Sequence, residues 1–220
     1  GYLIKDAQWP FVSGSPYADW FYFGAPVDDG NGGMEMAIIV IPRKDVEVLD
    51  DWNVIGLRGS GSNSVVVKEI FVPDYRVSLD RLAQKGHYII EELQDNPLYR
   101  TPFVPSLTLS IAAPALGIAQ GGFDLHMERV RKAGIGNTFY SRMSDAAVTH
   151  LQISEIDMKL ECARMLFRQA INDLDDYSTR GQDFTQKESI RIKAVFGYAN
   201  QQCKEAYDLM LAGAGSIFSY

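Results

Sequence analysis

The spacing of apolar residues changes once along the chain, and this change divides the sequence into two halves. In the first half, short runs of β-branched and aromatic residues predict strands. These runs cover residues 9–12, 20–24, 36–41 and 65–72. Clusters of glycine, aspartate, asparagine and serine at residues 28–33 and 59–63 predict turns between them. The first half is therefore predicted to be an antiparallel β-barrel or sandwich.

In the second half, apolar residues recur alternately three and four positions apart, which is the spacing of one face of an α-helix. One such stripe contains Ile153, Ile156, Leu160, Ala163, Phe167, Ala170, Leu174 and Tyr177. A second contains Ile192, Val195, Ala199, Cys203, Ala206 and Met210. A further helix is expected over about residues 106–131, where Pro114 predicts a kink or a later start. Long amphipathic helices joined by short loops predict an up-down bundle.

Three prolines between Asn96 and Pro105 mark the point where the spacing changes. Proline disfavours helical geometry in the residue before it, so this segment is a natural boundary. We therefore predict a β domain over residues 1–97 and a helical bundle over residues 98–220, which together make an α+β fold.

Composition narrows the function classes. Hydrophobic residues make up 46% of the chain, charged residues 22%, and the formal net charge is -7, which argues against a nucleic-acid or anionic-membrane partner. We expect no membrane span, no signal peptide and a cytoplasmic location. Cys162 and Cys203 lie in helical patterns and are expected to be buried thiols. The three histidines have no metal-ligand spacing, so no metal site is expected.

Three motifs in the first half suggest a family. Residues 8–14 read Gln-Trp-Pro-Phe-Val-Ser-Gly, and residues 51–62 read Asp-Trp-Asn-Val-Ile-Gly-Leu-Arg-Gly-Ser-Gly-Ser. Residues 67–73, Val-Lys-Glu-Ile-Phe-Val-Pro, follow. In this order they resemble the middle domain of the acyl-CoA-dehydrogenase-like superfamily, and the resemblance covers nearly the whole chain. It is strongest to oxygenase components of two-component flavin monooxygenases of the p-hydroxyphenylacetate 3-hydroxylase type.

One departure separates the branches of that superfamily. Acyl-CoA dehydrogenases usually carry an Arg-x-x-Phe-Gly sequence after the first C-terminal helix, and residues 129–140 contain none. The resemblance therefore implies an oxygenase that hydroxylates an aromatic or related small molecule with O2. Its reduced FMN or FAD would come from a flavin reductase that binds transiently. An acyl-CoA dehydrogenase and an inactive, oligomer-forming scaffold of the same fold remain alternatives.

The resemblance implies that the flavin lies against residues 9–14. Trp9 and Phe11 alternate along a predicted strand, so they would share one face and wall the isoalloxazine ring. The family places a hydroxyl such as that of Ser13 near the flavin N5 and C4a edge, which makes Ser13 the candidate catalytic residue. Gly14 would let the backbone approach the ring. An ordinary β core and a simple turn are the alternatives for these residues.

Arg58, Ser60 and Ser62 lie in a glycine-rich turn. Such a turn offers N–H groups, hydroxyls and a guanidinium, which suit a phosphate or the polar edge of a flavin. The alternative is a tight connection with a solvated arginine.

Further candidates follow the first long helix. Arg131, together with Arg129 and Lys132, is a candidate for flavin phosphate, although a solvated basic helix end is equally consistent. Phe139 and Tyr140 come next in a loop and are candidates for lining an aromatic-substrate pocket.

The family also has parts for which this sequence shows no counterpart. It begins with a helical domain, which is missing before Gly1, and it continues in further helix after a point equivalent to Tyr220. We therefore expect the chain alone to bind flavin weakly and to have little or no activity. Relatives commonly form tetramers through the C-terminal helices, so a homo-oligomer is expected.

Overall fold

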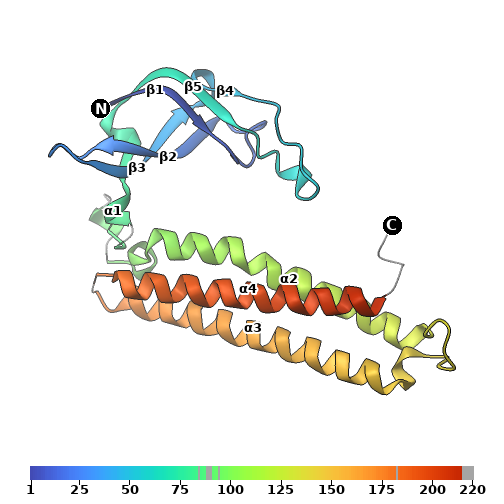
Figure 1. Cartoon of the computed structure of the whole chain (residues 1–220). Helices are drawn as coiled ribbons and strands as arrows, with labels where there is room; N and C mark the ends of the chain where they lie inside the picture. The colour runs from blue at the N-terminus through green and yellow to red at the C-terminus, as the bar shows by residue number, and fades with distance from the viewer. Residues whose placement is uncertain (84, 88–90, 94, 182, 215–220) are drawn as a thin grey trace. The chain divides into compact units, whose positions relative to one another are not determined.

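The structure is a computed structural model that describes residues 1–83, 85–87, 91–93, 95–181 and 183–214. The chain separates into two compact units, Gly1–Ala83 and Gln84–Tyr220 (Figure 1). This division falls before residue 97, because the segment after Ala83 contacts the helical part. His87 Nε2, for example, lies 2.8 Å from Asp183 Oδ1. The domain boundary between residues 97 and 98 stays a prediction.

The first unit contains two three-stranded antiparallel sheets. One has the order β1-β5-β4, with the strands β1 (Tyr2–Trp9), β5 (Val65–Val72) and β4 (Glu47–Val48). The other has the order β2-β3-β6, with the strands β2 (Trp20–Asp28), β3 (Met34–Pro42) and β6 (Val77–Leu79). The sequence did not predict β4 and β6, because these strands are too short to show an alternation of apolar and polar residues.

Alternate residues of both sheets meet in one core. This core consists of Phe21, Phe23, Ala25, Ile39, Ile41, Val65, Val67 and Val72. Burying a side chain of this size contributes about 1.5–3 kcal/mol. The core draws on two separate sheets, so the sandwich alternative is confirmed, and the barrel alternative is wrong for the described residues of this unit.

The first strand was predicted at the wrong place. It was expected over residues 9–12, but β1 covers Tyr2–Trp9 and ends there. Pro10 lacks the N–H that would continue the ladder, and Phe11 has φ +60, which lies outside the β region. Within β1 the adjacent residues Lys5 and Asp6 are both exposed, and Asp6 has φ +46, so this strand does not alternate with a strict period of two.

The second unit is an up-down bundle of three long helices that lie side by side (Figure 1). They are α2 (Phe103–Lys132), α3 (Ala147–Thr179) and α4 (Gln186–Ala214). A short helix, α1 (Asp80–Ala83), ends the first unit. Short 3-10 turns cover Arg43–Asp45, Arg58–Ser60, Asp74–Arg76, Glu91–Leu93, Pro97–Arg100 and Met143–Asp145.

The predicted stripes on α3 and α4 form the core of the bundle. Six of the eight α3 positions are buried, from Ile156 to Leu174, and five of the six α4 positions are buried as well. Ile153, Tyr177 and Val195, at the remaining positions, are partly buried. The two helical predictions are therefore confirmed.

The connection between α3 and α4 explains where these helices end and begin. Gly181 follows α3 with φ +67, the left-handed conformation that commonly terminates a helix. Thr185 and Glu188 then form a capping box, in which the Thr185 N–H donates to Glu188 Oε2 at 2.8 Å. Burial opposes ionisation of Glu188, but hydrogen bonds from Arg180 and Thr185 outweigh it and hold the pKa of this carboxyl below its ordinary value. The Glu188 carboxylate thus stays charged and caps the N-terminus of α4.

The helix α2 differs from its prediction. It begins at Phe103 and runs through Pro114, so a later start is wrong. Pro105 falls in the first turn, where a missing N–H costs nothing. Among the described helices, α2 is the one long and apolar enough to suit a membrane span. Length and composition alone do not place α2 in a membrane, and its Ala112 and Ala119 are buried in the bundle core.

Candidate functional site

A groove of about 370 Å³ lies in the β unit, beside the end of β1 and the start of β2. Its lining consists of residues 9–13, Ala18 and residues 20–24. The volume falls within the range of small-molecule sites, and most of the lining is aromatic or aliphatic. The groove therefore suits a flat, largely apolar ligand.

Trp9 and Phe11 both line this groove, but they do not share a strand face as predicted. The Trp9 ring stacks on Phe23 with centroids 4.2 Å apart, and its Nε1 donates to the Gly24 carbonyl at 2.8 Å. Phe11 follows the strand in a left-handed conformation and is 73% exposed, and its ring lies nearly perpendicular to that of Trp52 with centroids 5.9 Å apart. Trp9 is thus a fixed wall, whereas Phe11 stands at the rim.

Four predicted residues, from two distant segments, come together beside the groove. The Gly14 N–H donates to the Ser60 carbonyl at 2.8 Å, and Gly14 has φ +76, which favours glycine. Ser13 Oγ lies 2.8 Å from Ser62 Oγ, and Ser62 Oγ lies 2.8 Å from Ser60 Oγ. The glycine-rich turn is therefore anchored behind Ser13.

Arg58 lies in the same turn, but its side chain does not line the groove. Its Nε donates to the Val54 carbonyl at 2.7 Å, and the side chain is exposed. A role for Arg58 toward flavin stays a prediction.

Hydrogen bonds close the base of the loop that carries this turn. Asn63 Oδ1 accepts from the N–H groups of Asp51 and Trp52, at 3.3 and 3.0 Å. Asp51 Oδ1 accepts from the Ser64 N–H at 2.8 Å. Hydrogen bonds from the Ser64 hydroxyl and N–H hold the pKa of Asp51 below its ordinary value. Asp51 thus stays charged at neutral pH and keeps both ends of the loop together.

The sequence reasoning missed part of the aromatic lining. Trp20 and Tyr22 are exposed in β2, whereas Phe21 and Phe23 between and after them are buried. The Arg76 guanidinium lies 4.9 Å from the centroid of the Trp20 ring. Alternation of period two in these four aromatic residues was the signal that could have identified Trp20 and Tyr22 as surface residues.

The remaining predicted residues belong to the helical unit. Arg131 is exposed in the last turn of α2. Phe139 and Tyr140 follow in the loop, where their rings lie 4.3 Å apart and tilted by 38°. Phe139 is largely exposed. Their roles toward flavin phosphate and aromatic substrate stay predictions.

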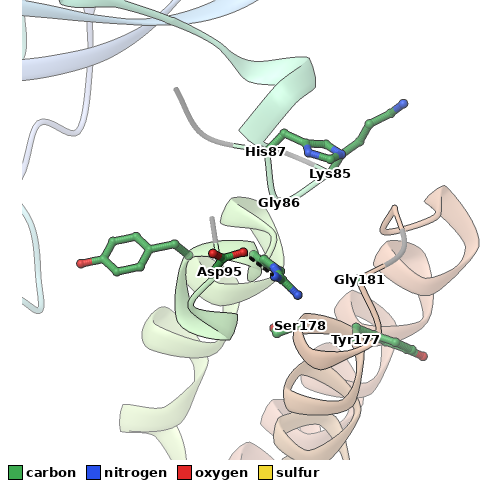
Figure 2. A pocket seen from close by; sticks show the side chains of 9 residues that line it. Lys85, Gly86, His87, Asp95, Tyr177, Ser178 and Gly181 are labelled. Atoms are coloured by element: carbon green, nitrogen blue, oxygen red, sulfur yellow. Dashed lines mark ion pairs between the residues drawn. The ribbon is translucent and has the colours of Figure 1, made fainter. Parts of the chain in front are cut away.

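A second hollow, of about 270 Å³, lies in the helical unit at the end of α3 (Figure 2). Its lining contains both basic and acidic side chains, among them Arg100 and Asp95. Arg100 Nη2 lies 3.8 Å from Asp95 Oδ1. Nearby, Asp183 accepts from His87 at 2.8 Å and Lys85 at 3.1 Å, and these bonds lower the pKa of Asp183. This hollow contains none of the predicted site residues.

Within the part of the chain that the structure describes, no group of three or more His, Cys, Asp or Glu residues is placed to hold a metal ion.

A β-sandwich that carries a groove at a Trp-to-Gly strand end, followed by an up-down bundle, defines the class of acyl-CoA-dehydrogenase-like proteins. Residues 109–218, half of the 220-residue chain, match the family described as acyl-CoA dehydrogenase, C-terminal domain. The chain belongs to this family.

Similar proteins include flavin-dependent oxygenases. The oxygenase subunit HsaA of a flavin-dependent monooxygenase from Rhodococcus jostii is 34% identical over 171 residues, which cover 74% of this chain and 42% of HsaA. The oxygenase component of p-hydroxyphenylacetate 3-hydroxylase from Acinetobacter baumannii is 26% identical over 98% of this chain and 51% of its own length. The chain thus spans about half the length of these relatives.

Solved structures agree on the fold. XiaF from Streptomyces sp., in complex with FADH2 and glycerol, superimposes with a TM-score of 0.83 at 27% identity. The superposition covers 96% of this chain and 54% of XiaF.

Proposed function

We propose that this chain is part of the oxygenase component of a two-component flavin-dependent monooxygenase, which hydroxylates an aromatic or related small molecule with reduced flavin and O2. The observation that carries this proposal is the aromatic groove with Ser13 in its lining. The names of the relatives support it, since HsaA and p-hydroxyphenylacetate 3-hydroxylase are both oxygenase components.

The groove fits a flavin ring in size and chemistry. Trp9 offers a flat wall that its stack on Phe23 and its bond to Gly24 hold in place. Ser13 offers a hydroxyl in an otherwise largely apolar lining. A bound reduced flavin would supply the electrons for O2 activation, and the walls of the groove would exclude water from it. Arg58, on the unit that carries the groove, is proposed to contact its polar edge or phosphate, and Arg131 of the helical unit stays a candidate for flavin phosphate.

The partners follow from the same proposal. A flavin reductase would bind transiently and supply reduced FMN or FAD, and the substrate would be a small aromatic molecule near Phe139 and Tyr140. A cytoplasmic location suits this supply of reduced flavin.

Replacing Ser13 with alanine should weaken binding of reduced flavin about tenfold or more and lower the yield of hydroxylated product, because a hydrogen bond to an exposed hydroxyl that the bound ring shields from water would contribute roughly 1–3 kcal/mol. Anaerobic titration of the purified protein with reduced FMN and FAD measures the affinity. Coupled turnover of the whole oxygenase component, of which this chain is proposed to be a part, with a flavin reductase and phenolic substrates measures the yield.

The matched control is Ser110→Ala, which removes an exposed serine hydroxyl on α2 that donates to the Ser106 carbonyl of its own helix. Equal affinities of the Ser13→Ala variant and the unchanged protein would contradict a flavin contact at Ser13. Bound FAD that is bleached by an acyl-CoA without any reductase would favour the dehydrogenase alternative instead.

We also propose a homotetramer in which α2 contributes an interface. An exposed stripe on α2 repeats every three or four residues, the spacing that packs one helix against another. It consists of Leu107, Ile111, Pro114, Ile118, Gly121 and Leu125. Such a stripe on a surface favours association.

Replacing Ile118 with glutamate should convert the oligomer to smaller species, since a charge would be buried in the interface. Light scattering after size exclusion measures the mass. Ile190→Glu, at another exposed isoleucine on α4, is the control and should leave the mass unchanged. An unchanged protein that is monomeric at high concentration would contradict the proposal.

A further inference from the structure

The three serines beside the groove form a chain of hydroxyls whose direction can be deduced. A hydroxyl has one proton to donate and two lone pairs that accept. Ser60 Oγ lies 2.8 Å from the Leu57 carbonyl, which can only accept, so the Ser60 proton points to Leu57. The contact of 2.8 Å between Ser60 and Ser62 then requires Ser62 to donate to Ser60.

Ser13, the next hydroxyl in this chain, lines the groove and is oriented by Ser62. Because the Ser62 proton is committed to Ser60, the contact of 2.8 Å between Ser13 and Ser62 requires Ser13 to donate to Ser62. Ser62 is only 5% exposed, so water does not readily take over either of its bonds. While its contact with Ser62 holds, Ser13 keeps its proton on Ser62, and in the groove that it lines it offers a ligand its lone pairs.

The chain of hydroxyls ends at the carbonyl of Leu57, which has an unusual backbone conformation. Leu57 has φ +56, a left-handed value that is uncommon for residues other than glycine. Its carbonyl accepts not only from the Ser60 hydroxyl but also from the Ser60 N–H at 3.0 Å and from Trp52 Nε1 at 3.1 Å. Strain of this kind often occurs where a functional geometry is maintained.

We propose that Ser60 and Ser62 are positioning residues, which orient the Ser13 hydroxyl so that it acts only as a hydrogen-bond acceptor toward the flavin. This inference rests on the proposed function, because it assumes a flavin in the groove. Reduced flavin carries a proton on N5, which such an acceptor can bind. Oxidised flavin has a lone pair on N5, which would face the lone pairs of Ser13. The serine chain thus makes the site select the reduced form.

The test measures the preference of the purified protein for reduced over oxidised flavin as the midpoint potential of bound flavin relative to free flavin. Each tenfold preference corresponds to about 30 mV for this two-electron couple. The unchanged protein should raise the potential. Ser62→Ala frees the Ser13 proton to rotate toward the ring, and the preference should fall about tenfold.

Further variants separate positioning from general damage to the loop. Ser60→Ala should also lower the preference for reduced flavin. Ser62→Thr keeps the hydroxyl, so it should retain the preference of the unchanged protein. Ser15→Ala is the matched control, because the Ser15 hydroxyl is buried and bonds Gly61 of the same loop at 3.0 Å but lies outside the chain of three serines. It should leave the potential unchanged.

The outcomes distinguish this inference from the function on which it rests. If Ser13→Ala lowers the preference for reduced flavin while Ser62→Ala and Ser60→Ala do not, the positioning role of Ser60 and Ser62 is wrong. The proposed flavin contact at Ser13 is then still supported. If Ser13→Ala also changes neither affinity nor potential, the flavin site at this groove is wrong as well. A fall of the same size in Ser15→Ala would show that loop order, not hydroxyl direction, sets the potential.

Discussion

Replacing Phe196 with alanine should lower the free energy of unfolding of the helical unit by about 3–5 kcal/mol. Phe196 is 1% exposed and lies on α4 in the core of the bundle. Its ring centroid lies 5.5 Å from that of Phe167 on α3, with the rings inclined by 33°. The substitution would therefore remove apolar contacts on two helices and leave a cavity between them.

Chemical denaturation followed by helical circular dichroism measures this loss. The control is Tyr198→Ala, which removes an aromatic ring from the same helix, where Tyr198 is 53% exposed. A change at such a surface position is usually within about 0.5 kcal/mol. Equal losses for the two variants would show that Phe196 does not lie in a packed core.

Phe196 also shows the limit of predicting buried residues from helical periodicity. The predicted stripe from Ile192 to Met210 contains Val195 and omits the neighbouring Phe196, although Phe196 is buried more deeply. A spacing of three and a spacing of four both follow one face of a helix, so periodicity identifies the face but not which of two adjacent residues points to its centre. Here α2 packs beside α4, which brings Phe196 inward as well.

The strands show a different limit. Alternation predicted the centre of β2 and β3, where one face is buried, but it placed the first strand over residues 9–12 instead of Tyr2–Trp9. Aromatic content suggested that Phe11 belongs to a strand, whereas Pro10 before it removes a ladder N–H. The conformation of Phe11 depends on its tertiary neighbours, among them Trp52, and single-sequence reasoning does not see these.

The candidate site was predictable only through resemblance. Ser13 and Ser62 are 49 positions apart, and no local pattern brings them together. The pairing of β1 with β5 does so, because Trp9 lies opposite Val65 and the residues beyond each strand end then meet. The hydroxyl contact is thus a consequence of register, which is set by the whole sheet.

Gly61→Ala should weaken binding of reduced flavin about tenfold or more by disturbing the turn between Ser60 and Ser62. Gly61 has φ +52, where a residue with a Cβ atom costs roughly 1–2 kcal/mol. A Cβ would also lie 3.0 Å from Cδ and Cγ of Pro16, a rigid ring with little freedom to move away. The turn must therefore shift, and the hydroxyls on either side of Gly61 shift with it.

Gly59→Ala provides the matched control, because a Cβ at Gly59 would meet nothing within 4 Å and its backbone needs no left-handed conformation. Anaerobic titration with reduced flavin should give this variant an affinity within about twofold of the unchanged protein. Equal affinities for both variants would mean that the turn does not hold the site. The two glycines are separated by Ser60 alone, so a difference between them isolates the backbone conformation at Gly61 as the property that keeps Ser62 against Ser13.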